Sequence, residues 1–324
     1  FFYPSVGLSG VISEMIQMPS FIDYMKVRGS FSSVGMPYPR NLTSPTYEYN
    51  EATQSWKPKT HYPIGDLKPE RTDSWEVGLD MKLFKDFNLG LSWYLANTFN
   101  QTFDPQISVS SGYTTIYLQT GYVRNTGLEL SLGYGHTWNN NFRWDSNFTL
   151  SHNKNKIKEL VRDYVHPETG ELINKDRLDV GGLGKARFIL KEGGTLGDLY
   201  TQSDLKRDDN GMVDIDPTGI VAIENNLPDI KLGSVFPKAN LAWSNHFSWK
   251  GISLSALFTA RIGGIVYSAT EAAMDQYGVS ERSALARDNG GVLVNNRTLV
   301  DAQNYYTTIG SESCLLYTSD AADE

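Results

Sequence analysis

The sequence has little cysteine, no long apolar run and no excess of basic residues, and each lack excludes a class of protein. Its 324 residues include one cysteine, which excludes an intrachain disulfide and a thiolate metal cluster. No run of about 18 consecutive apolar residues occurs, so no transmembrane helix is expected, although a barrel with a polar interior remains possible. The formal charge of −8 argues against nucleic acid as the main partner.

Both ends of the sequence predict that it is part of a longer protein. Residue 1 begins inside strand-like sequence, without an initiator Met or the basic and apolar segments of a signal peptide. The run from Cys314 to Glu324 resembles a translated sequencing adapter. We therefore expect residues 313–324 to be a non-native tail, in which the single cysteine carries no functional information.

Apolar and polar residues alternate over several segments, which is typical of strands with one apolar and one polar face. In segment 67–84, the apolar parity holds Trp75, Val77, Leu79, Met81 and Leu83. The alternation recurs over 87–95, 127–134, 142–151 and 252–262, with Leu257 as an exception, and more weakly in FFYPSVGLSGVI and MKVRGSFSSVG. The pattern predicts an all-β fold.

Three features favour strands that cross a bilayer. Several alternations run for about ten residues, as tilted membrane strands require, whereas soluble strands centre on about five or six. Tight turns at 85–86, 139–141 and 250–251 alternate with long connections at about 36–68, 104–118 and 159–236, as in outer-membrane barrels. Aromatic residues of the kind that form membrane-interface girdles flank all three tight turns. They are Phe84, Phe87, Trp138, Phe142, Trp144, Phe247 and Trp249.

The stretch 159–236 must contain an even number of crossings if all tight turns lie on one side of the membrane. One hairpin that includes ARFILKEGGTLGDLYT, or no crossing at all, satisfies this condition, and we favour the hairpin with an external loop. The segment 267–278 predicts a short loop helix.

No motif predicts an enzyme, a cofactor or a metal site. The segment DLKRDDNGMVDID suggests calcium, but alignment on Gly211 places Lys206 and Pro217 at the first and last ligand positions of an EF-hand loop, so a tight Asn-Gly turn is favoured. GGLGKA lacks the first Gly and the final Ser or Thr of a phosphate-binding loop, and the five histidines have no ligand spacing. We therefore expect no catalytic and no metal-binding residues.

Aromatic residues in the long connections are the candidate ligand-binding residues, because planar rings stack on sugars or pack against a partner protein. Packing within each loop is the alternative for every one of them. The candidates are Tyr47, Tyr49, Trp56, Tyr62, Tyr113, Tyr117 and Tyr122.

Several motifs in consistent order resemble the SusC/RagA family of TonB-dependent receptors. LKPERTDSWEVGLDMKLF is similar to the family's "LKPE … GLD" strand, and NTGLEL, with Asn125, Gly127 and Glu129, to its "N-x-G-x-E-L" motif, which we interpret as strand architecture. FFYPSVGLSG, MKVRGSFSSVG and FPKANLAWSNHFSWKGISLSALFTARIGG match in the same order. The resemblance implies that residues 1–312 are a partial antiparallel β-barrel in the cell outer membrane, without its plug domain and flanking strands.

The resemblance also implies a function and partners. Receptors of this Bacteroidetes type import a nutrient, usually an oligosaccharide and sometimes a peptide, beneath a SusD-like surface lipoprotein. Energy comes from the TonB complex through the plug domain, and outer-membrane lipid surrounds the barrel. The alternatives are a passive porin, or a soluble secreted β-rich module in which Trp93, Leu130 and Phe148 are buried against a second sheet.

Overall fold

A computed structural model describes residues 2–38, 48–57, 68–103, 117–138, 141–165, 170, 172–312 and 318–320. The chain forms two compact units, each of which is assembled from separate stretches of sequence. The first unit comprises Phe1–Leu178, Leu190–Leu196 and Pro237–Ile262. The second unit comprises Asp179–Ile189, Gly197–Phe236 and Gly263–Glu324.

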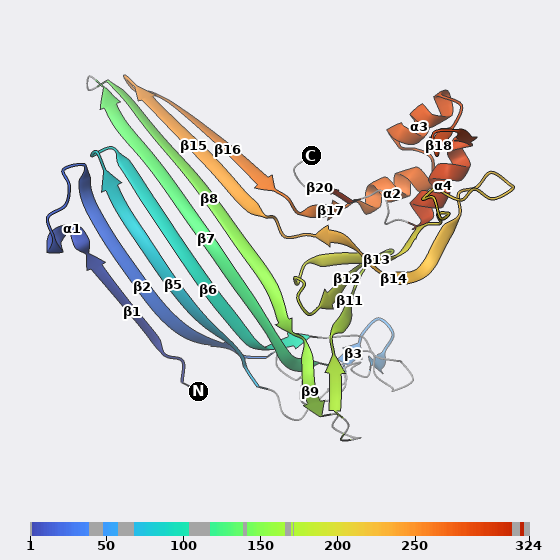
Figure 1. The fold of residues 1–324 in the computed structure, drawn as a ribbon, viewed down its shortest axis with the longest axis horizontal. Coiled ribbons are helices and arrows are strands. Elements are labelled where there is room, and N and C mark those ends of the chain that lie inside the picture. The colour runs from blue at the N-terminus through green and yellow to red at the C-terminus, as the bar shows by residue number, and fades with distance from the viewer. Residues whose placement is uncertain are drawn as a thin grey trace. The chain divides into compact units, whose positions relative to one another are not determined.

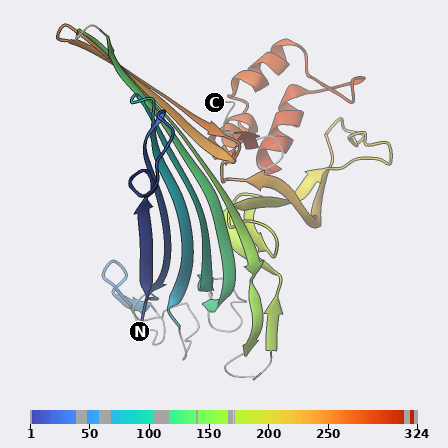
Figure 2. The same ribbon diagram turned by 60° about the vertical axis from the view of Figure 1, so that its left-hand side comes forward.

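The first unit is built on an eight-stranded antiparallel sheet with the order β1-β2-β5-β6-β7-β8-β15-β16 (Figure 1). The strands follow one another in chain order and curve together across the sheet (Figure 2). Their bounds are β1 Ser5–Val11, β2 Ile22–Met36, β5 Glu70–Leu83, β6 Phe87–Phe103, β7 Leu118–Trp138, β8 Phe142–Glu159, β15 Ala239–Trp249 and β16 Ile252–Ile262. Most of these strands are longer than those of ordinary soluble sheets.

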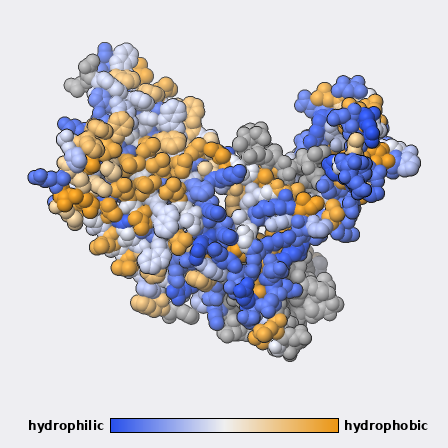
Figure 3. Space-filling model, viewed as in Figure 1, coloured by the Kyte–Doolittle hydropathy of each residue, from blue (hydrophilic) through white to orange (hydrophobic). Residues whose placement is uncertain are grey.

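One face of this sheet is apolar across its width, as the alternation predicts. In the register, Leu79 lies opposite Val27 and Leu91. The row continues from Leu91 through Leu130, Leu150 and Leu241. Hydrophobic residues gather over the sheet in the surface view (Figure 3). The predicted faces of the strands are therefore confirmed, and neighbouring strands align them into one continuous surface.

Two of the predicted tight turns have the backbone geometry of short hairpin connections. Lys85 has φ 66° and Lys250 has φ 44°, and the latter is followed by Gly251 at φ 88°. Positive φ values at successive positions match the right-handed twist of the flanking strands. The middle turn lies partly outside the described residues, at 139–140.

The favoured hairpin crossing between 159 and 236 is wrong. β8 pairs directly with β15 over ten residues, from Asn240–Ser151 to Trp249–Phe142, so no crossing separates them. The segment that begins ARFILK forms β12 (Ala186–Lys191) of a separate four-stranded sheet. The alternative without a crossing holds because hydrogen bonds between β8 and β15 leave no place for an inserted hairpin.

Smaller elements complete the first unit. They are α1 (Ile12–Met15) and two hairpins, β3 (Glu48–Asn50) with β4 (Ser55–Lys57) and β9 (Val161–Val165) with β10 (Leu172–Lys175). A buried cluster forms where the chain folds back on the inner side of β7 and β8. It comprises Val123, Ile157, Leu160, Val161, Leu178 and Leu190.

The second unit combines the sheet β11-β12-β13-β14 with helices and short hairpins. The sheet strands other than β12 are β11 Arg177–Leu183, β13 Asp198–Leu205 and β14 Ile223–Ser234. The remaining elements are β17 Ile265–Tyr267, α2 Ala269–Gln276, α3 Glu281–Asp288, β18 Val292–Val294, β19 Thr298–Val300, α4 Ala302–Glu312 and β20 Thr318–Asp320. Helix α2, which Ser268 caps through the N–H of Glu271, confirms the predicted loop helix. In the part of the chain that the structure describes, no helix is long and apolar enough to cross a bilayer.

Two Asp side chains organise consecutive turns in the segment considered above for calcium. Asp208 accepts hydrogen bonds from the backbone N–H groups of Asn210 and Met212, which lower the pKa of its carboxyl group. The hydroxyl of Thr218 and the N–H of Ile220 lower the pKa of Asp216 in the same way. The predicted tight turn is confirmed, since these oxygens serve the backbone of their own turns.

Candidate functional site

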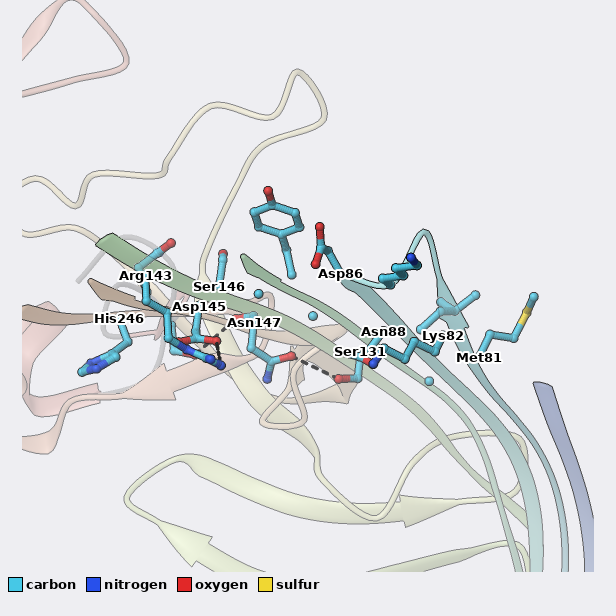
Figure 4. Close-up of a pocket in the computed structure, with 18 of the residues that line it drawn as sticks. Met81, Lys82, Asp86, Asn88, Ser131, Arg143, Asp145, Ser146, Asn147 and His246 are labelled. Carbon is cyan, nitrogen blue, oxygen red and sulfur yellow. Dashed lines mark hydrogen bonds and ion pairs between the residues drawn. The ribbon is translucent and has the colours of Figure 1, made fainter. Parts of the chain in front are cut away.

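The polar face of the eight-stranded sheet carries the two largest cavities described for the first unit. The one nearer the short turns has a volume of about 1010 Å³ and is lined by charged, amide and hydroxyl side chains (Figure 4). Its labelled residues include Lys82, Asn88, Ser131, Arg143, Asp145, Asn147 and His246. Leu257, the exception in the alternation of β16, also lines this cavity.

Hydrogen bonds within this cavity hold its side chains in place. Arg143 donates from Nε and Nη2 to the two oxygens of Asp145, at 2.7 Å each. Ser131 Oγ donates to Asn147 Oδ1 at 3.3 Å from the neighbouring strand. Because Arg143 occupies both oxygens of Asp145, this pair presents a fixed set of polar groups to the cavity.

A second cavity of about 590 Å³ lies farther along the same face, beside an ion-pair cluster. Arg28 Nη1 lies 3.0 Å from Glu76 Oε1, and Arg28 Nη2 donates to Ser92 Oγ at 2.6 Å. Glu129 and Arg261 line the cavity as well. The inner face therefore offers charges of both signs to a polar ligand.

Contacts across three strands account for the glycine of the NTGLEL motif. The ring of Tyr94 on β6 lies over Gly127, where an added Cβ would be 2.2 Å from Tyr94 Cζ. Tyr94 Oη donates to Asn153 Oδ1 at 3.2 Å. The motif's Gly leaves room for the tyrosine ring, so its position reflects strand architecture.

The motif's asparagine anchors the chain segment that covers the inner side of the sheet. Asn125 Oδ1 accepts from Asn155 Nδ2 at 2.9 Å, and Asn155 Oδ1 accepts from the N–H of Leu196 at 2.9 Å. Asn155 is 8% exposed, so both hydrogen bonds are largely shielded from water. Alternation indicated the face of these residues but gave no sign of their partners.

The four aromatic candidates that the structure describes do not come together in one site. Tyr49 and Trp56 face each other on the β3–β4 hairpin, with ring centroids 5.2 Å apart and exposed fractions of 50% and 65%. Tyr117 packs against the buried cluster of the first unit. Tyr122 stacks on Phe99 at 4.8 Å. Tyr47, Tyr62 and Tyr113 lie outside the described residues.

Metal binding has no structural support in the described ranges. Among those residues, no group of three or more His, Cys, Asp or Glu side chains is arranged to hold an ion. The polar inner face and the exposed Tyr49–Trp56 pair are therefore the candidate binding surfaces.

Comparison with known proteins gives a consistent family. A family model described as TonB dependent receptor-like, beta-barrel matches residues 1–180. TonB-dependent receptor P39 of Formosa agariphila is 28% identical over 211 residues, which cover 63% of this chain and 18% of the relative. TonB-dependent receptor P26 of the same bacterium is 26% identical over 292 residues, which cover 82% of this chain and 28% of the relative. The chain thus spans less than a third of the length of these curated relatives.

Solved structures agree on the fold. The structure of the RagAB peptide transporter superposes with a TM-score of 0.64 at 19% identity, covering 84% of this chain and 30% of that chain. A RagAB peptide importer in the closed-closed state gives a TM-score of 0.60 at 20% identity, covering 82% of this chain and 30% of that chain. At these identities the likeness concerns the fold of the sheet.

Proposed function

The chain belongs to the TonB-dependent receptor β-barrel family, and we propose that it forms part of an importer that takes up a nutrient through the outer membrane. The predicted SusC/RagA resemblance, all-β barrel fold and outer-membrane location are confirmed at the level of family and fold. This family comprises transport receptors, not enzymes. Binding and conformational change, without bond cleavage, would then carry the activity.

The observation that carries this proposal is the division of one sheet into two chemically opposite faces. One face carries the apolar rows, whereas the opposite face holds cavities lined by Arg28, Glu129 and Asn147. Trp93 on the apolar face is 42% exposed, and no second sheet covers it within the described residues. These facts disfavour the soluble binding module and support a wall between lipid and a polar passage.

We propose an oligosaccharide as the cargo, with the Tyr49–Trp56 pair as an external contact. Two exposed rings at 5.2 Å and an interplanar angle of 58° offer apolar faces to a sugar ring, and amide and hydroxyl groups along the inner face offer hydrogen bonds. Peptide is the second cargo class, since a similar structure is that of a peptide transporter. Tyr47, Tyr62 and Tyr113 remain predicted members of this external site.

The proposal includes two protein partners. A SusD-like surface lipoprotein would deliver cargo from outside, and the TonB complex would supply energy through a plug domain of the whole receptor. Family membership supports dependence on TonB. The lipoprotein partner rests on the SusC/RagA resemblance, with which the RagAB-like fold agrees.

Uptake by the source bacterium tests the importer proposal. The gene for the intact receptor is deleted, and accumulation of labelled oligosaccharides and labelled peptides is compared with that in a complemented strain, with and without a protonophore. We expect oligosaccharide uptake to disappear on deletion and on protonophore treatment. Uptake that needs the receptor but resists the protonophore would indicate a passive porin, and loss of peptide uptake alone would replace the proposed cargo.

The external contact is tested in the same strain by the double variant Tyr49→Ala/Trp56→Ala. Loss of two stacking rings is expected to weaken cargo binding by roughly tenfold, since an aromatic contact contributes about 0.5–1.5 kcal/mol beyond its buried area. Tyr277→Ala is the matched control, because Tyr277 is 77% exposed and belongs to the second unit. Equal uptake by the double variant and the control would remove the hairpin from the cargo site.

A further inference from the structure

Basic side chains continue the outward face of β7 and β8 beyond its apolar part. Along β8, Phe148 and Leu150 share their parity with Lys154 and Lys156. In the register, Lys154 lies opposite Thr126 and Lys156 lies opposite Arg124. Arg124, Lys154 and Lys156 form what we call the outer cationic row. A register shift follows at Val123–Tyr122, where the row ends.

Burial of the intervening residues fixes the direction of these side chains. Val123 and Ile157 are 1% and 0% exposed and belong to the cluster on the inner side of the sheet. Neighbouring residues of a strand point to opposite faces, so Arg124 and Lys156 point outward, to the side of the apolar rows. Asn155, which is 8% exposed, places Lys154 and Lys156 outward by the same argument.

The row carries positive charge that the described residues do not neutralise. Arg124 donates to Asn97 Oδ1 at 2.9 Å and to Tyr122 Oη at 2.5 Å, both uncharged partners. Neither it nor the two lysines has an ion pair within the described part of the chain. Two strands away on β5, Asp73 lies opposite Asn97 at the same level and is occupied by Arg71 at 2.8 Å. Three positive charges thus gather on the outside of a chain whose net charge is −8.

The position of the row along the strands corresponds to lipid headgroups. Arg124 and the girdle residue Trp138 are about fourteen residues apart on β7, which at about 3.4 Å per residue and a tilt of roughly 40° corresponds to about 36 Å across the membrane. Hydrocarbon occupies only about 30 Å. With Trp138 at the interface on the short-turn side, the row therefore lies in the headgroup layer on the side of the long connections, which is the outer leaflet.

We infer that the outer cationic row binds the phosphate groups of an outer-leaflet glycolipid. Lysine and arginine donate charge-assisted hydrogen bonds to phosphate, and lysine stems can lie along the apolar rows while their ammonium groups reach the headgroups. The row continues directly from the apolar face. One lipid molecule can therefore contact the apolar face with its acyl chains and the row with its phosphates. This inference rests on the outer-membrane location and is independent of the proposed cargo.

Titration of the intact receptor in detergent with diphosphorylated lipid A, followed by native mass spectrometry, tests the inference. The variant Lys154→Gln/Lys156→Gln is expected to bind roughly 30-fold more weakly than the wild type, because a basic residue near an anionic surface contributes about fivefold. Lys85→Gln/Lys250→Gln, with the same charge change at the short turns, is expected to retain wild-type affinity. Binding should also weaken as ionic strength rises.

Further arms distinguish the lipid from other ligands and from misfolding. Lys154→Arg/Lys156→Arg should bind like the wild type, which separates loss of charge from loss of fold. The wild type should bind phosphatase-treated lipid A as weakly as the Gln variant binds lipid A. Inorganic phosphate at a concentration equal to that of lipid A should not displace the lipid from the wild type. Equal binding by wild type and Gln variant, equal binding of the dephosphorylated lipid, or full competition by inorganic phosphate overturns the inference. So does a Gln variant that keeps the lipid and loses a protein partner instead.

Discussion

Gly127→Ala adds only one methyl group but should destabilise the barrel, because the ring of Tyr94 occupies the space that this group needs. The new Cβ would lie 2.2 Å from Tyr94 Cζ and 2.4 Å from its Cε1 and Oη, more than 1 Å closer than an ordinary contact. The ring must swing away, and with it goes the hydrogen bond from Tyr94 Oη to Asn153. Overpacking typically costs about 1–3 kcal/mol, and we expect a loss of stability in that range.

Gly90→Ala is the matched control on the same polar face. Its Cβ would be 3.6 Å from Ser131 Cβ and 3.8 Å from Asp80 Oδ1, both ordinary contacts. Because alanine restricts the unfolded chain more than glycine, this variant should be neutral or stabilising by up to about 1 kcal/mol. Gly127 and Gly90 thus differ in the side chain that lies over them. The comparison of the two variants therefore measures the effect of the Tyr94 ring on stability.

Urea unfolding of the intact receptor in detergent micelles, followed by tryptophan fluorescence, measures the difference. The double variant Tyr94→Ala/Gly127→Ala completes a mutant cycle in which the Gly127 substitution should cost close to nothing once the ring is gone. Identical midpoints for Gly127→Ala and Gly90→Ala, or strictly additive effects in the cycle, would show that the tyrosine ring is not what requires glycine here.

Three further outcomes are expected. Asn155→Leu removes the acceptor for the N–H of Leu196, and should cost about 1–3 kcal/mol and speed amide hydrogen exchange at Leu196; unchanged exchange would contradict this anchor. Trp144→Phe removes the indole N–H that donates at 3.1 Å to Asn245 Oδ1 on the apolar face, and should lower the free energy of unfolding in urea by about 1 kcal/mol, whereas Trp249→Phe, whose indole has no such bond within the described residues, should not. Asp216 has a lowered pKa in the folded state, so its contribution is present above the ordinary carboxyl pKa of 3.8 and is lost as pH falls through the folded value; the protection factors of the amides in this turn, which are corrected for intrinsic exchange, should fall under acid in the wild type and be low at all pH values in Asp216→Asn.

The mean hydropathy of the chain can be understood only when both faces of the sheet are considered. Polar residues on the inner face lower the mean hydropathy to −0.37, so that composition alone resembles that of a soluble protein. The outer face shows why this average misleads, since Leu79, Leu91, Leu130 and Leu150 form one row only when their strands are paired. Period-two alternation is therefore the informative signal, and average hydropathy is not.

The sequence by itself determined which face each strand residue occupies, where the short turns lie, and that the segment 267–278 contains a helix. These features depend on residues close in the chain, because side chains alternate along any strand and turns need only their own backbone angles. The same local rules placed Leu257 correctly as an exception to the apolar face of β16.

Only the tertiary structure decided which strands pair and which side chains meet. Pairing of β8 with β15, the ring of Tyr94 over Gly127, and the alignment of Arg124 with Lys156 all depend on register between segments that are distant in sequence. Alternation says nothing about register, because a shift of two residues preserves every face while it changes every partner. For this reason the sequence indicated the wall of the barrel, while the cavities and the outer cationic row required the folded sheet.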